Sequence, residues 1–208
     1  KWHEKELRDK KEMFLQKELV QTKLSALEAK VNSHFLYNSL NSIAGLALVD
    51  PEKTRQMALA LSGFFRYNMN REQKTMVDIH EEMEIIGLYL QIEKIRFGDS
   101  LNYKMDIAPD IAGLMIPRML LQPLVENCVK HGLKGGVERL FIDISITQDN
   151  DTWILSVKDD GASFEKPFVS GYGLKSLYDK LDFFYPGKYR VEITTEKEKV
   201  IKIILNRV

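Results

Sequence analysis

Residues 121–132 read LQPLVENCVKHG and combine apolar residues with an amide, a lysine and a histidine. If this stretch is helical, Asn127 and Lys130 lie three residues apart and face the same way. An amide oxygen can ligate Mg²⁺, and a lysine can neutralise phosphate. Glu126 is then either a general base or merely a surface carboxylate. The stretch therefore predicts a helix that contributes to a nucleotide site.

Two later segments extend this candidate site. A predicted strand ends at Asp159 and is followed by Asp160 and Gly161. A carboxylate at that point accepts a hydrogen bond from an exocyclic amine such as that of adenine, and a glycine lets a planar base approach the backbone. Gly171 and Gly173 precede a predicted helix, whose N-terminal amides suit phosphate. Each signal is weak alone, but their order along the chain is specific, and no P-loop sequence is present.

We expect the C-terminal half of the chain to be α+β. Alternating apolar and polar residues predict five strands, over residues 101–107, 140–146, 153–159, 190–195 and 200–205. One helix is expected to begin at Pro117 and to run to about His131, where Gly132 ends it. A second is expected over residues 174–184, after a glycine-containing loop of residues 160–172.

The N-terminal half is expected to be entirely helical. Residues 3–30 are rich in Glu, Lys, Leu and Gln and contain no Gly or Pro, and their apolar spacing resembles a coiled-coil seam. The alternative is a solvated helix with one buried stripe. We expect this helix to continue to about Val49 and to be followed, after a tight turn, by an antiparallel helix over residues 52–70.

A third N-terminal helix has clear end signals in the sequence. Asp78 is its expected N-cap, with Glu81 three residues later completing a capping box. The helix is expected to run to about Phe97 and to end at Gly98. The boundary between the two halves therefore falls near residue 98.

Charge is spread unevenly along the 208 residues. The 30 basic and 30 acidic residues cancel, which argues against a nucleic-acid binder that works through bulk charge. Residues 1–30 carry fourteen charged residues, whereas residues 31–49 carry none. This uncharged stretch approaches the length of a membrane span, but its Asn, Ser and His side chains would be costly in lipid. We expect a helix packed on two sides within a bundle. The single cysteine, Cys128, excludes an internal disulfide and favours a reducing compartment.

The uncharged stretch contains His34, which lies one helical turn before Asn38. One interpretation is a core histidine that is hydrogen-bonded to Asn38. The other is a nucleophile that is neutral at physiological pH and attacks a phosphoryl group, with Asn38 orienting the ring or a water. The histidine alone leaves both interpretations open.

Taken together, the chain resembles the LytS-like sensor histidine kinases over about residues 20–206. The resemblance rests on five segments: VNSHFLYNSLNSI at 31–43, YLQIEKIRFGD at 89–99, the stretch at 121–132, DDG at 159–161 and GYGLKSL at 171–177. It implies a dimerising long-helix hairpin followed by an α/β sandwich of the GHKL (Bergerat) ATPase type. The implied domains are a signalling coiled-coil stalk (1–30), dimerisation and phosphotransfer helices (20–97) and an ATP-binding catalytic domain (98–208).

The resemblance also implies roles for individual residues. His34 is the phosphoacceptor, and Asn127 is the magnesium ligand, with Lys130 and His131 following it. Asp159 reads adenine. The remaining nucleotide-binding positions belong to the two glycine-rich boxes and are Gly161, Gly171, Gly173 and Leu174. Arg96 matches a family arginine that serves as a phosphate contact or in an interdomain ion pair.

The implied function is that of a two-component sensor kinase. Such a protein transfers phosphate from ATP, with Mg²⁺, to His34 and then to an aspartate of a cognate response regulator. It acts as a homodimer. Because the chain begins at Lys1 without a signal peptide, we expect it to be the cytoplasmic domain of an inner-membrane-anchored bacterial receptor, cut from its sensor region.

Several positions depart from the family pattern. Ser33 replaces the usual proline, and Ser163 replaces the second glycine of the first box. Phe35 stands where other histidine kinase classes place an acidic base, which leaves Glu126 as the remaining candidate. A charged turn at residues 196–199 replaces a late glycine. An alternative interpretation is therefore a catalytically impaired pseudokinase that acts as a dimeric partner-binding module. A second is an ATPase of the same fold without a phosphohistidine.

Overall fold

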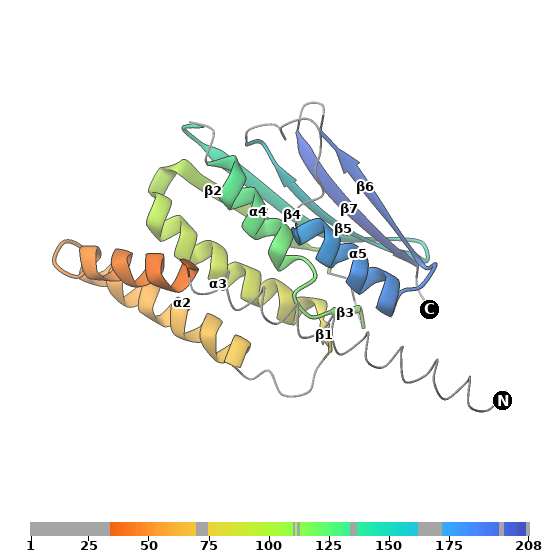
Figure 1. The fold of residues 1–208 in the computed structure, drawn as a ribbon, viewed down its shortest axis with the longest axis horizontal. Helices are drawn as coiled ribbons and strands as arrows, with labels where there is room; N and C mark the ends of the chain where they lie inside the picture. The colour runs from red at the N-terminus through yellow and green to blue at the C-terminus, as the bar shows by residue number, and fades with distance from the viewer. Residues whose placement is uncertain are drawn as a thin grey trace, which may run out of the picture.

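A computed structural model gives the fold of the chain (Figure 1). It describes residues 34–69, 75–109, 111, 113–133, 137–161, 172–195 and 198–206. The predicted stalk of residues 1–30 lies outside the described residues, as do Ser33, Ser163 and Gly171. Within the described part of the chain, no helix is both long and apolar enough to cross a membrane.

The described N-terminal part is a helical hairpin that leads into a third helix. A helix of residues 34–46 is followed by a turn and then by α2 (Pro51–Met69). The first helix ends three residues earlier than Val49, because the amides of Val49 and Asp50 both donate to the carbonyl of Leu46 and close a turn. Asp50 in turn accepts a hydrogen bond from the amide of Lys53, which caps the start of α2.

The helix of residues 34–46 is anchored on one side only. Phe35 and Ser39 are its buried residues, and the Phe35 ring packs against Phe64 of α2 at a centroid distance of 5.1 Å. Tyr37 and Leu40 are 66% and 50% exposed. Among the described residues, no element covers the second face of this helix, so the expected packing on two sides stays a prediction.

The third helix, α3 (Ile79–Phe97), has the predicted ends. The Asp78 carboxylate accepts from the amide of His80 at 2.8 Å, and Gly98 takes a positive φ of 56° while its amide donates to the carbonyl of Lys94. After the 3-10 turn η1 (Gly98–Ser100), the chain enters the sheet.

A mixed five-stranded sheet forms the C-terminal part. Its strand order is β2-β4-β5-β7-β6, with β2 and β4 parallel and the other neighbours antiparallel. The strands are β2 (Leu101–Ile107), β4 (Leu140–Asp149), β5 (Thr152–Asp159), β6 (Tyr189–Thr194) and β7 (Lys199–Asn206). These five strands confirm the predicted ones. Helices α4 (Gln122–Gly132) and α5 (Tyr172–Phe184) lie over one face of the sheet (Figure 1), and alternate strand residues fill the space between them.

The predicted start of α4 at Pro117 is wrong. Pro117 ends the short strand β3 (Met115–Pro117), which pairs with β1 (Met76–Asp78), and the helix begins at Gln122. The residues between follow a turn in which Met119 takes a positive φ of 54°. Pro123 is the proline that occupies the first helical turn, where its missing N–H costs nothing.

The buried carboxylate of Glu82 holds this turn in place. Glu82 lies on α3 and accepts hydrogen bonds from the amides of Met119, Leu121 and Gln122, at 2.8, 3.0 and 3.4 Å. Burial raises the pKa of Glu82, and these three amides act in the opposite direction. Lys180 of α5 donates to the carbonyl of Met119 from the other side. One carboxylate therefore links α3 to the start of α4.

Replacing Glu82 with alanine is expected to lower the free energy of unfolding by about 3 kcal/mol, because buried amides lose their acceptor. Glu84 is exposed on the same helix and provides a matched control. Its alanine variant is expected to stay within about 0.5 kcal/mol of the parent. Urea unfolding followed by circular dichroism measures both values, and equal stabilities for the two variants would contradict the role given to Glu82.

Candidate functional site

Three segments that are far apart in the sequence meet around α4. An ideal Cβ built on Gly161, which follows β5, would lie 2.5 Å from the Cα of Gly132 at the end of α4. A Cβ on Gly132 would lie 2.5 Å from a methyl carbon of Leu140. The two glycines therefore allow a backbone-to-backbone approach that no other residue permits. The predicted convergence of the first two segments is seen in this contact.

The start of α5 also lies against α4. A Cβ on Gly173 would lie 2.4 Å from the amide nitrogen of Asn127 on α4. Gly173 is therefore needed for the Asn127 amide to lie against the first turn of α5. Leu174, the next residue, is buried under that helix. Gly171 lies outside the described residues, so its predicted role stays a prediction.

Asp159 is the buried charge of this site. Its side chain is 4% exposed, and Oδ1 accepts from the amide of Gly161 at 3.0 Å. The Nζ of Lys199, the first residue of β7, lies 2.8 Å from the same oxygen. The Cys128 thiol faces the carboxylate and is hydrogen-bonded to it; burial raises the pKa of this thiol, and the nearby Asp159 charge raises it further. Cys128 is therefore a neutral donor here.

Lys199 is a site residue that the sequence analysis missed. A signal was present, since Lys199 is in phase with Ile201, Ile203 and Leu205, whose side chains point into the core. A lysine at an inward position of a strand indicates a buried partner. Its partner was not predictable, because Asp159 lies 40 residues away and meets it only through the pairing of β5 with β7.

The other predicted residues of α4 differ in their surroundings. Glu126 is half-buried and accepts a hydrogen bond from the Nε2 of Gln122 at 2.7 Å. Lys130 and His131 are exposed near the end of the helix. The structure thus brings Asn127, Asp159, Gly161 and Gly173 together, whereas Lys130 and His131 lie at the exposed end of α4.

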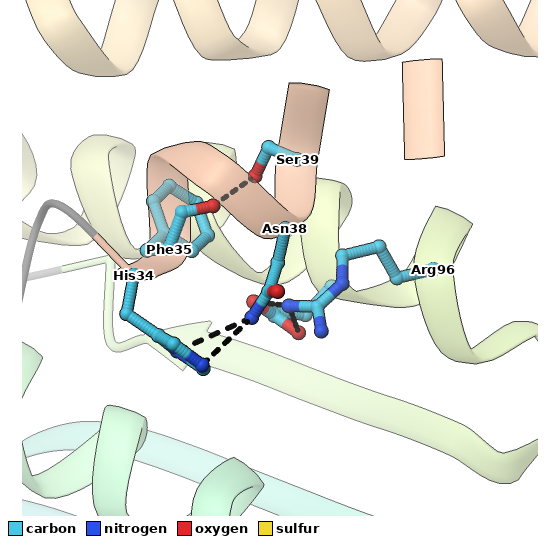
Figure 2. Close-up of polar contacts among 6 residues, drawn as sticks. His34, Phe35, Asn38, Ser39 and Arg96 are labelled. Carbon is cyan, nitrogen blue, oxygen red and sulfur yellow. Dashed lines mark hydrogen bonds and ion pairs between the residues drawn. The ribbon is translucent and has the colours of Figure 1, made fainter. Parts of the chain in front are cut away.

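His34 is exposed at the start of the described part of its helix. The Asn38 amide nitrogen lies 3.2 Å from its Nδ1 and 3.5 Å from its Nε2 (Figure 2). The predicted contact between these two residues is confirmed, but a core histidine is excluded by the exposure. Ser39 holds the helix by donating to the carbonyl of Phe35 at 2.8 Å (Figure 2).

Arg96 makes an ion pair within its own helix. Its Nη1 lies 2.7 Å from one carboxylate oxygen of Glu93 and 2.8 Å from the other (Figure 2). Glu93 is 3% exposed, and burial raises its pKa while Arg96 opposes this effect. The guanidinium also lies 4.9 Å from the ring centre of Phe97. The observed ion pair is therefore local to α3.

Tyr89 of α3 is buried and packs against the His34 helix. Its ring is 5.2 Å from that of Phe35. Burial raises the pKa of Tyr89 strongly, and the charges of Glu93 and Glu126 add to this effect. The hydroxyl is therefore neutral and close to carboxylates from both α3 and α4.

The chain is similar in sequence to known proteins over most of its length. Residues 22–101 match the family model described as Histidine kinase. The chain is 33% identical to the sensor protein LytS of Oceanobacillus iheyensis, over 79% of this chain and 28% of that protein. It is 30% identical to the sensor histidine kinase YesM of Bacillus subtilis, over 97% of this chain and 36% of that protein. Among solved structures, it aligns with the histidine kinase AdeS of Acinetobacter baumannii at 16% identity and a TM-score of 0.48, over 80% of this chain and 81% of that one.

The family model and the curated relatives point to the class of sensor histidine kinases. Within it, the chain belongs to the LytS-like family. The sensor histidine kinase BtsS of Escherichia coli is a further relative, 31% identical over 90% of this chain and 33% of that protein. The chain spans about a third of the length of these curated relatives, between 28% and 36%.

Replacing Gly161 with alanine is expected to destabilise the fold by about 2 kcal/mol or more, because the new Cβ meets backbone atoms of α4 that cannot move independently. Gly45 provides the control, since a Cβ there has no atom within 4 Å. Gly45 lies in the helix of residues 34–46, so the G45A variant is expected to raise the free energy of unfolding by up to about 1 kcal/mol. Thermal and urea unfolding measure both variants. A neutral G161A would contradict the close approach of the two glycines.

Proposed function

We propose that this chain is the catalytic core of an ATP-dependent protein-histidine kinase. The γ-phosphoryl group of ATP passes to a ring nitrogen of His34 and then to an aspartate of a separate response regulator. The observation that carries the proposal is the exposed His34, held by Asn38, in a chain of the sensor histidine kinase family.

The first transfer needs a ring nitrogen with a free lone pair. That nitrogen forms a bond to the γ-phosphorus as the bond from phosphorus to the ADP oxygen breaks, and the ring loses its N–H proton to a base. Asn38 fixes the orientation of the ring. If its amide is turned over, its oxygen accepts from Nδ1–H, and the Nε2 lone pair is left for attack. Glu126 is the proposed base, and its half-buried carboxylate already accepts one hydrogen bond.

The residues at α4 fit a nucleotide with its metal. The amine of adenine would bind Asp159, and Asn127 would supply one amide oxygen to Mg²⁺, which neutralises phosphate charge when bound. No group of three or more His, Cys, Asp or Glu side chains that would hold a metal ion is found in the described parts of the chain. Lys130 and His131 are exposed near the end of the same helix and would contact phosphate.

A homodimer through the helical hairpin is part of the proposal. Large apolar side chains are exposed on both of its helices, namely Tyr37, Leu40 and Leu59. Pairing with a second copy would cover them and would enclose the helix of residues 34–46 on the face left open in one chain. An upstream sensor, anchored in a membrane, would then act on His34 through the predicted stalk.

Replacing His34 with glutamine is expected to abolish incorporation of ³²P from labelled ATP, because the acceptor nitrogen is lost. His80, which is exposed at the start of α3, provides the matched control, and H80Q is expected to label as the parent does. The label on the parent should be lost in acid and kept in base. Persistent labelling of H34Q would exclude His34 as the acceptor.

The pseudokinase alternative makes a different prediction for nucleotide binding. We expect the parent chain to bind Mg-ATP in calorimetry and the D159N variant to bind at least about tenfold more weakly, because asparagine lacks the negative charge and has an NH₂ donor in place of the second acceptor oxygen. If calorimetry detects no binding of ATP to the parent chain at millimolar concentration, a partner-binding module would be favoured. Binding without labelling at His34 would favour an ATPase.

A further inference from the structure

Lys199 is almost completely buried beside the proposed base-reading carboxylate. Its side chain is 5% exposed, and its Nζ lies 2.8 Å from Oδ1 of Asp159. The two residues are cross-strand partners in the antiparallel pair of β5 and β7. The ion pair is therefore set by strand register and not by the chance approach of two long surface side chains.

The groups that face Asp159 differ in charge. The Gly161 amide and the Cys128 thiol are neutral donors, the first from the loop after β5 and the second from α4. Lys199, from β7, supplies a positive charge. A buried carboxylate without a counter-ion takes up a proton, because the charged form is poorly solvated. Within the described residues, the neighbouring pair of Lys158 and Glu198 is satisfied separately, with its atoms 2.7 Å apart nearer the surface.

We propose that Lys199 is a positioning residue for nucleotide recognition: its ammonium holds Oδ1 of Asp159, so that the carboxylate's other oxygen accepts from the exocyclic amine of the base. The inference rests on the proposed function in that the ligand is ATP. The inference adds Lys199 to the residues on which nucleotide binding depends. Lys199 acts through Asp159 and contacts neither the phosphates nor His34.

The geometry explains why a charged residue is used at an inward position of β7. Lys199 and the Gly161 amide both contact Oδ1, which fixes the plane of the carboxylate. If the lysine were absent, a protonated Asp159 would present a hydroxyl to the amine of adenine, and two donors would face each other. Removal of Lys199 should therefore cost affinity at neutral pH, and the loss should shrink as rising pH ionises the carboxyl group.

The test compares Mg-ATP binding by calorimetry at pH 6, 7.5 and 9. We expect K199M to bind about tenfold more weakly at pH 7.5 and to recover affinity at pH 9, whereas K199R keeps the charge and binds within about threefold of the parent. Lys202 is exposed on the outer face of the same strand, and K202M is the matched control. The K199M substitution should weaken the binding of inosine triphosphate, which lacks the amine, less than it weakens the binding of ATP.

A nucleotide-free measurement separates this inference from the proposed function. With the aspartate side chains labelled with ¹³C, the carboxyl carbon of Asp159 is expected to titrate at higher pH in K199M than in the parent, while K199R stays close to the parent. If the parent fails to bind ATP, the proposed function fails, but this titration still tests the role of Lys199. The inference is overturned if the titration of K199M is unchanged, if K199M binds ATP as well as or better than the parent, or if K199R loses as much affinity as K199M.

Discussion

The arrangement of the candidate site depends on the burial of one negative charge, that of Asp159. A carboxylate at 4% exposure must be compensated from every side. The compensation comes from three elements: Lys199 on β7, the Gly161 amide after β5 and the Cys128 thiol on α4. Each contact fixes the distance between two elements. The close approach of Gly161 to Gly132 follows from the same requirement, because α4 must lie directly on the end of β5 for its thiol to reach the carboxylate.

A second buried carboxylate fixes the position of α4 at its other end. Glu82 accepts from backbone amides before the helix and thereby attaches it to α3. The helix that carries Asn127 is thus held at its start by Glu82 and near its end by the contact with Gly161. The helix of His34 is attached differently, by the ring of Phe35 against α2 and α3. An apolar contact of this kind has no fixed direction, so it tolerates sliding more readily than a hydrogen-bonded carboxylate does.

Much of the fold was predictable from local sequence. The five strands follow from alternation, because one face of the sheet is buried and the other is not. The ends of α3 follow from Asp78 and Gly98, whose capping chemistry is local. The start of α4 was predicted wrongly at Pro117, because a proline suits both the end of a strand and the first turn of a helix. Only the pairing of β3 with β1 and the amide contacts of Glu82 decide between the two.

For the site, the residue types and their order along the chain were predictable from the sequence: His34 one turn before Asn38, Asn127 on a helix, Asp159 at a strand end and glycines on either side of a loop. These features are local, since each depends on spacing within a few residues. The packed fold was needed to establish that His34 is exposed, that Arg96 pairs with Glu93 and that Lys199 lies against Asp159. The physical reason is that exposure and charge pairing depend on which elements are packed together, and a strand's partner across a sheet is set by register between segments that are distant in the chain.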